Sequence, residues 1–73
     1  DYTLTDAMRV QVNGEEREVA EGLSLVELLE QLKVDRSRVA VEVNAEVVRR
    51  ARHPEVRLKA GDQVEIVTFV GGG

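Results

Sequence analysis

The chain has no cysteine and no tryptophan, and it has one histidine, one phenylalanine, one tyrosine and one proline among its 73 residues. Without cysteine, neither a disulfide framework nor a cysteine metal site can form, and His53 alone cannot build a histidine cluster. The scarcity of aromatic residues argues against a platform on which nucleic-acid bases stack. We therefore expect neither a metal site nor a disulfide-stapled fold.

Positive charge and long apolar runs are also scarce. Fourteen acidic and ten basic residues give a net charge of −4, which opposes binding to a phosphate backbone. No apolar run approaches the roughly 20 residues that span a bilayer. We therefore expect a cytoplasmic protein with no membrane or nucleic-acid partner. We interpret the densest basic stretch as a solvated loop face or a protein contact. It consists of Arg49, Arg50, Arg52 and Arg57.

The length predicts one small domain. A chain of this size buries only about 60 % of the surface that its unfolded form exposes, which leaves little room for a catalytic cavity. The sequence also lacks a recognisable pair of nucleophile and base, so we do not expect an enzyme. His53 lies between Arg52 and Pro54 in a predicted loop, and we expect a solvated surface histidine.

The first clear element is a strand that begins at Met8. Residues 8–12 alternate apolar and polar, Asn13-Gly14 is a strong hairpin signal, and residues 16–20 form the returning strand. Residues 1–7 show no strong periodic pattern. We expect Met8 to be the natural start, residues 1–7 to be an artificial or disordered extension, and the folded domain to cover residues 8–70.

A helix is predicted to begin at Ser24 and to run to Lys33. Ser24 and Glu27 have the spacing of a capping box, in which each side chain satisfies a backbone donor at the helix start. Four leucines recur at the helical spacing and predict a stripe that packs in the core. They are Leu25, Leu28, Leu29 and Leu32.

The second half of the chain predicts three further strands. They cover residues 39–43, 46–48 and 63–69, with an Asn44-Ala45 turn after the first and turn residues at 59–62. Residues 49–54 have an irregular pattern. This order predicts an α+β fold of the ubiquitin-like β-grasp type, with a mixed four- to five-stranded sheet and one main helix on one face. Other small α+β domains fit the same pattern.

Alternation along the last strand places its side chains on two faces. Val64 and Ile66 share the face that the helix covers, whereas Val67 and Phe69 share the other. The second pair is either exposed beside the C-terminal tail, where a partner enzyme would contact it, or buried by a curl of the sheet edge.

The last strand leads directly into three glycines. Gly71, Gly72 and Gly73 have no side chain, so they predict a flexible tail that enters a narrow cleft and presents the Gly73 carboxylate to ATP. The alternative is a linker that was cut short, which we disfavour because such a cut seldom follows a strand that runs directly into glycines.

Four segments carry a resemblance to a known family. They are Val10-Gln11-Val12-Asn13-Gly14, Val39-Ala40-Val41-Glu42-Val43-Asn44, Gly61-Asp62 and the ending from Val64 to Gly73. Together they resemble the ThiS family, the sulfur carriers of thiamine thiazole synthesis. The resemblance covers Met8 to Gly73, and its specific part is the Phe-Val-Gly-Gly-Gly ending together with the Val-Glu-Val-Asn strand. It implies a β-grasp fold and a carrier that acts as a protein cosubstrate.

The resemblance also implies partners and site residues. A ThiF-type enzyme would use ATP and magnesium to adenylate Gly73, and a persulfide donor would convert the adenylate into a thiocarboxylate. A ThiG-type thiazole synthase would receive that sulfur. Gly71 and Gly72 would be the flexible approach, and Val67, Phe69 and Val70 would contact the partners. The carrier itself would hold no stably bound cofactor.

Two alternatives stay open from the sequence. A sulfur carrier for molybdopterin synthesis or for tRNA thiolation would share the same tail chemistry. A non-covalent ubiquitin-like interaction module would instead use the sheet surface and leave the tail idle. Deletion of Gly72 and Gly73 separates the carriers from the module, because a module would keep its affinity.

Overall fold

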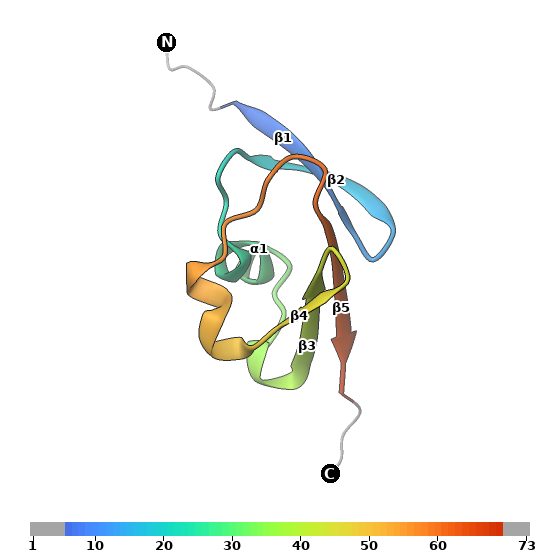
Figure 1. Cartoon of the computed structure of the whole chain (residues 1–73), viewed down its shortest axis with the longest axis vertical. Helices are drawn as coiled ribbons and strands as arrows, with labels where there is room; N and C mark the ends of the chain where they lie inside the picture. The colour runs from blue at the N-terminus through green and yellow to red at the C-terminus, as the bar shows by residue number, and fades with distance from the viewer. Residues whose placement is uncertain (1–5, 70–73) are drawn as a thin grey trace.

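A computed structural model describes residues 6–69 of the chain. Within this range it has five strands, one α-helix (α1) and two 3₁₀ helices (η1 and η2) (Figure 1). In chain order they are β1 Ala7–Val12, β2 Glu15–Ala20, α1 Leu25–Gln31, η1 Arg36–Arg38, β3 Val39–Val43, β4 Glu46–Val48, η2 Arg50–Glu55 and β5 Gln63–Thr68. None of the helices in this range is long and apolar enough to cross a membrane.

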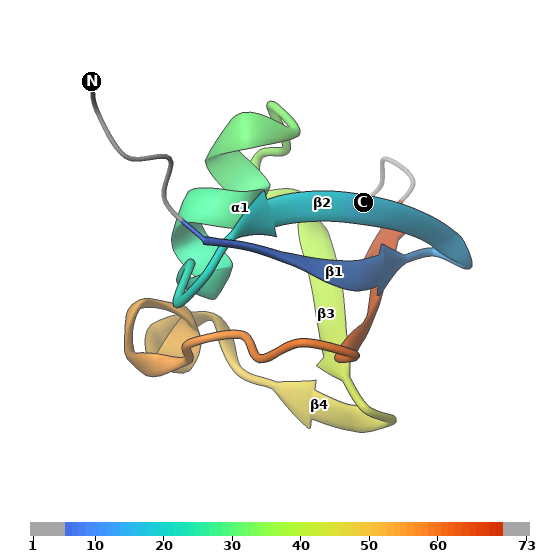
Figure 2. The ribbon, with the colours of Figure 1, turned by 90° about the horizontal axis from the view of Figure 1, so that it is seen from above.

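The strands form one mixed sheet in the order β2-β1-β5-β3-β4. β1 and β5 pair in parallel, and the other neighbours pair antiparallel. The last strand of the chain therefore lies in the centre of the sheet. Helix α1 and η2 lie on the same side of the sheet (Figure 2), which leaves its other face open. The predicted mixed sheet with one main helix on one face is confirmed, with five strands.

The first hairpin follows the alternation of its sequence. Met8, Val10 and Val12 are buried, and the residues between them are exposed. Asn13 and Gly14 both have positive φ, 51° and 84°, as a tight hairpin turn requires. β1 begins at Ala7, one residue before the expected domain boundary. The Asp6 carbonyl accepts a hydrogen bond from the Glu21 N–H at 3.0 Å, and residues 1–5 lie outside the described range.

The predicted capping box starts α1. The Ser24 hydroxyl oxygen accepts from the Glu27 N–H at 3.1 Å, and the Glu27 carboxylate accepts from the Ser24 N–H at 2.9 Å. The hydrogen bond from the Ser24 N–H is the largest cause that lowers the pKa of the Glu27 carboxyl. The helix ends at Gln31, two residues before the predicted end at Lys33. Lys33 has a φ of 59°, so it ends the helix in the left-handed conformation that glycine usually adopts there.

The leucine stripe forms the centre of the core, as predicted. Leu25, Leu28 and Leu29 are fully buried, and Leu32 at the end of the stripe is partly buried. They pack against buried residues of the inner sheet face, which are mainly valines because β-branched side chains suit a pleated surface. These are Met8, Val10, Val12, Val19, Val39, Val41 and Val64.

The segment after β4 departs from the sequence prediction in two ways. Residues 50–55 form η2 instead of an irregular loop, and His53 is only 1 % exposed instead of solvated. Because a 3₁₀ helix repeats every three residues, His53 and Val56 turn to the same side, towards the protein interior. The His53 Nε2 lies 3.1 Å from the Val48 carbonyl and donates to it, while Nδ1 has no hydrogen-bond partner among residues 6–69.

Because His53 is buried, we expect the free energy of unfolding to fall at mildly acidic pH. Burial lowers the pKa of His53, and its hydrogen bond with Val48 opposes this only in part. The folded protein therefore favours neutral imidazole, so stability is full above the ordinary pKa of about 6.5 and falls as the pH drops below it. Urea unfolding between pH 8 and 5 should show this decline, and His53→Gln should remove that part of it. Parallel pH profiles for the two proteins would contradict the prediction.

Candidate functional site

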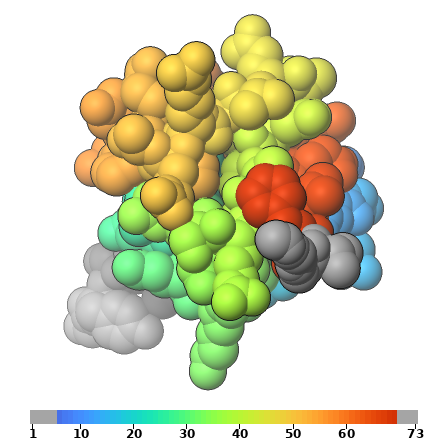
Figure 3. All heavy atoms as spheres, turned by 90° about the horizontal axis from the view of Figure 1, so that it is seen from below, coloured from blue at the N-terminus to red at the C-terminus, as the bar shows by residue number. Residues whose placement is uncertain are grey.

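The open face of the sheet carries three large exposed apolar side chains. Val47 on β4 is 70 % exposed, Val67 on β5 is 60 % exposed, and Phe69 just after β5 is 58 % exposed. Figure 3 shows the last residues of β5 (red) at the surface beside the yellow-green atoms of the β3 region. Of the two alternatives for Val67 and Phe69, the structure therefore has the exposed one.

The pairing of β3 with β4 and β5 places Val47 and Val67 close to two glutamates on the open face. Val47 on β4 and Glu65 on β5 both lie opposite Glu42 on β3, and Val67 lies opposite Ala40. Since side chains at alternate positions share a face, Glu65, Val67 and Phe69 follow one another along the open face towards the C-terminus. We call the set of Val47, Val67, Phe69, Glu42 and Glu65 the outer patch.

Two asparagines at the hairpin turns hold β5 from both sides. The Asn13 Oδ1 accepts from the Ile66 N–H at 2.7 Å, and its Nδ2 donates to the Ile66 carbonyl at 3.3 Å. The Asn44 Oδ1 accepts from the Gln63 N–H at 2.9 Å, and its Nδ2 donates to the buried Asp62 at 3.0 Å. Each asparagine side chain accepts a hydrogen bond from a backbone N–H of β5 beside a hairpin turn. These bonds hold β5 in place between its two neighbouring strands.

The predicted strand to Phe69 ends one residue earlier, at Thr68. The Phe69 N–H nevertheless donates to the Arg38 carbonyl at 2.8 Å, which continues the pairing with the β3 side. The remaining predicted site residues lie outside the described range. They are Val70, Gly71, Gly72 and Gly73.

Charges of both signs surround this end of the sheet. Arg38 pairs with Asp35 at 3.6 Å, and both side chains are well exposed, so the pair contributes little stability. Asp35 caps η1 by accepting from the Ser37 hydroxyl and N–H at 2.7 and 2.9 Å, which lowers its pKa. The basic stretch is exposed, with Arg49, Arg50 and Arg52 all at the surface, which fits either a solvated face or a protein contact.

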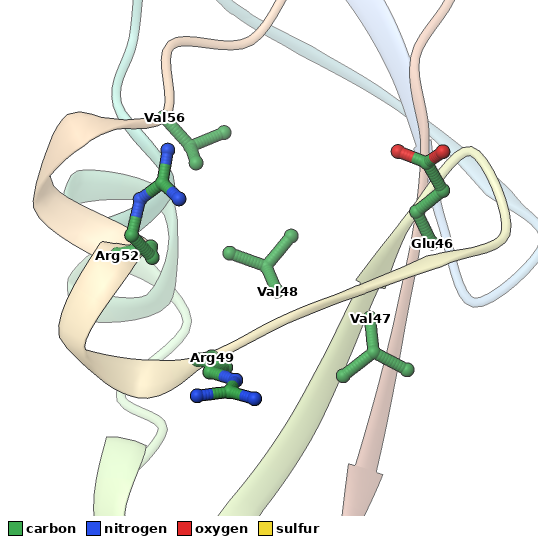
Figure 4. Close-up of a pocket in the computed structure, with 6 residues that line it drawn as sticks. All are labelled: Glu46, Val47, Val48, Arg49, Arg52 and Val56. Carbon is green, nitrogen blue, oxygen red and sulfur yellow. The ribbon is translucent and has the colours of Figure 1, made fainter.

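A hollow of about 300 Å³ lies between β4 and η2. It is lined by Glu46, Val47, Val48, Arg49, Arg52 and Val56 (Figure 4). The lining includes no hydroxyl, thiol, histidine or lysine, and its one carboxylate, that of Glu46, has no base beside it in this lining. Among residues 6–69, no group of three His, Asp or Glu side chains is placed to hold a metal ion.

Val47 is an exposed residue of this face that the sequence pattern of β4 alone does not reveal. Figure 4 shows Val47 and Val48 pointing to opposite sides of β4. Val47 shares the open face with Glu42, its partner on β3. The alternation Val-Glu-Val in residues 41–43 predicts that Glu42 points to the open face. A two-residue turn at Asn44-Ala45 pairs Glu42 with Val47, so Val47 is predicted to point to the same face.

Comparison with known proteins shows similarity along almost the whole described chain. The model of the ThiS family matches residues 10–73. The sulfur carrier protein ThiS of Thermus thermophilus is 41% identical over 64 residues, which are 88% of this chain and 98% of that protein. The crystal structure of the thiamine biosynthesis protein (ThiS) of Geobacter metallireducens superposes with a TM-score of 0.79 at 43% identity, covering 90% of this chain and 100% of that one.

A longer relative is also similar. The thiazole synthase of Paramagnetospirillum magneticum is 42% identical over 66 residues, which are 90% of this chain and only 20% of that synthase. This chain therefore spans one fifth of that relative's length.

The fold, the exposed end of β5 and these similarities agree with the resemblance seen in the sequence. This chain belongs to the ThiS family and has a β-grasp fold.

Proposed function

We propose that this chain is a sulfur carrier protein of thiamine biosynthesis, which acts as a cosubstrate of other enzymes, and that Gly73 carries the sulfur as a C-terminal thiocarboxylate. The observation that supports this most is that the family match extends to Gly73, the last of three glycines that follow the central strand β5. A tail without side chains can enter a cleft that a Cβ atom would block. β5 is held by both of its neighbours and by two asparagine side chains, so it gives the tail a rigid base.

The proposed chemistry begins with activation of the carboxylate, which is a poor electrophile. In a ThiF-type enzyme, a Gly73 carboxylate oxygen attacks the α-phosphorus of ATP and pyrophosphate leaves. The terminal sulfur of a persulfide then attacks the acyl carbon and AMP leaves. A second thiol cleaves the resulting acyl disulfide and takes up its other sulfur, so the thiocarboxylate remains on the carrier. Magnesium and the cations of the enzyme stabilise the phosphate charge.

A ThiG-type thiazole synthase is the proposed sulfur acceptor. The relative named thiazole synthase supports this choice, because it includes a segment similar to this chain. We propose that Val67, Phe69 and Val70 contact the partner enzymes. Val67 and Phe69 are exposed on the face that α1 leaves open, and exposed apolar patches mark interaction sites.

Intact-protein mass spectrometry tests the carrier chemistry. The chain is incubated with a ThiF-type enzyme, ATP, magnesium and a persulfide source, and fragmentation then locates any change. We expect the mass gain of one oxygen-to-sulfur exchange, confined to Gly73. An unchanged mass with an enzyme that thiolates another ThiS protein under the same conditions would contradict the proposal.

Substitution of the exposed apolar residues tests their proposed role in contacting partners. Val67→Ser combined with Phe69→Ser removes apolar contacts but leaves the buried core intact, so we expect an unchanged unfolding midpoint. The KM of the adenylating enzyme for the carrier should rise about tenfold or more, with little change in kcat, because the lost contacts contribute to binding and not to the chemical step. Val26→Ser on α1 serves as the control. Equal KM values for the two variants would contradict the role.

A further inference from the structure

The outer patch contains two like charges directly opposite each other. Glu42 on β3 and Glu65 on β5 are partners in the antiparallel register, and both side chains are exposed. Like charges at directly opposite positions of neighbouring strands destabilise a sheet. The isolated protein therefore keeps a locally unfavourable arrangement in the middle of its open face.

No cation of the described chain compensates this pair. The ion pairs within residues 6–69 are Arg9–Glu16, Arg38–Asp35 and Arg52–Glu55, and neither Glu42 nor Glu65 belongs to one of them. The positions directly beside the two glutamates on the same face are uncharged. They are Ala40, Asn44 and Val47 beside Glu42, and Gln63 and Val67 beside Glu65. Arg49 follows Val47 by two positions, and it belongs to none of these ion pairs.

Apolar side chains flank the acidic pair on both sides. Val47 lies next to Glu42 across the β3–β4 ladder, and Val67 lies two residues after Glu65 on β5. Both valines are more than half exposed. A partner that covers them must also cover the glutamates between them, and burial of two unpaired carboxylates would be costly. The partner surface must therefore bring a positive charge to this point.

We propose that the outer patch docks onto the thiazole synthase, which places a lysine or arginine between Glu42 and Glu65 and apolar side chains against Val47 and Val67. This inference rests on the proposed function, in which the synthase receives the sulfur. The negative charge of the two glutamates favours a positively charged residue on the synthase. An arginine fits best, because its planar fork can donate to two carboxylates at once.

The position of Glu65 on β5 also limits where the synthase cation lies. Glu65 and Gly73 are eight residues apart on one chain. A fully extended segment of that length spans at most roughly 26–29 Å, at 3.3–3.6 Å for each residue. The docking cation therefore lies within this distance, plus the length of the Glu65 side chain, of the site where Gly73 delivers its sulfur. Docking at the acidic pair therefore sets how far from the reaction site the base of the tail is held.

The double variant Glu42→Gln with Glu65→Gln tests the proposal by two effects of opposite sign. Glutamine keeps the size of the side chain and removes the repulsion, so the unfolding midpoint of the isolated carrier should rise by a few degrees. The affinity for purified thiazole synthase, measured by titration calorimetry with the unmodified carrier, should fall about tenfold or more. Misfolding cannot produce this combination.

Glu21→Gln with Glu30→Gln is the matched control. It changes the net charge by the same amount, at exposed positions before and on α1, away from the open face. We expect its affinity for the synthase to stay near that of the unsubstituted chain. Binding of the unsubstituted chain should weaken as salt increases, and this dependence should be smaller for the Glu42/Glu65 variant.

Three outcomes would overturn the proposal. The first is equal affinity of the two double variants for the synthase, and the second is no measurable binding of the unsubstituted chain. The third is a loss of affinity only for the adenylating enzyme, which would assign the patch to that partner. Because the titration uses unmodified carrier and the mass measurement uses no synthase, failure of this inference is distinguishable from failure of the proposed function.

Discussion

A chain without Gly72 and Gly73 should fold normally and accept no sulfur. The described core residues all lie between Met8 and Val64, and the last described backbone contact is that of Phe69, so the deletion removes no described contact. The new terminal carboxylate would end about 7 Å short of the reaction site, at 3.3–3.6 Å for each missing residue. Correct placement of reacting atoms supplies much of a catalysed rate, so this displacement should abolish adenylation.

The measurement combines far-ultraviolet circular dichroism with the mass assay for thiocarboxylate. Removal of Asp1 and Tyr2 is the matched control, since it shortens the other end by the same length and should leave sulfur loading unchanged. The deletion also separates the two classes of function that the sequence left open. If the shortened chain still supported thiazole formation, the tail would be idle and a non-covalent module would be the better description.

Leu29→Ala should remove a large fraction of the free energy of unfolding. Leu29 is fully buried between α1 and the inner sheet face. Truncation of a buried leucine to alanine costs about 2–5 kcal/mol, through lost burial and the cavity that remains. A domain of this size has a total stability of roughly 4–11 kcal/mol, at 0.05–0.15 kcal/mol for each residue. The loss is therefore a large fraction of the whole.

Urea unfolding followed by circular dichroism would measure the effect. Leu32→Ala is the matched control, because Leu32 belongs to the same stripe but is only partly buried at the helix end. We expect its midpoint to fall clearly less. Equal losses for the two variants would show that burial along the stripe does not determine its contribution.

The elements that were predicted correctly are those whose signals are local. The first hairpin follows from alternation and Asn13-Gly14, and the start of α1 follows from the pairing of Ser24 with Glu27. The helix end was predicted two residues too late. Lys33 has the left-handed conformation that usually marks a helix end by a glycine, so the sequence carries no glycine signal there. A local signal was present at the start of the helix and missing at its end.

The sequence prediction for His53 was wrong, because this histidine is buried and not solvated. Its neighbours Arg52 and Pro54 are exposed, and they gave the segment the composition of a solvated loop. Its burial depends on where η2 packs. The Leu25 N–H donates to the Val56 carbonyl at 2.9 Å, which ties the end of η2 to the start of α1. This contact joins residues 31 positions apart, so no local pattern reveals it.

By itself, the sequence determined the order of the strands and the helix, the leucine stripe, the carrier family and the glycine ending, because each of these depends on neighbouring residues or on a recognisable motif. Only the tertiary structure decided that β5 is central, that Val67 and Phe69 are exposed, and that Glu42 faces Glu65. These properties depend on pairing between segments that are far apart in the chain. Pairing of that kind is set by how the whole core packs, which no short stretch of sequence specifies.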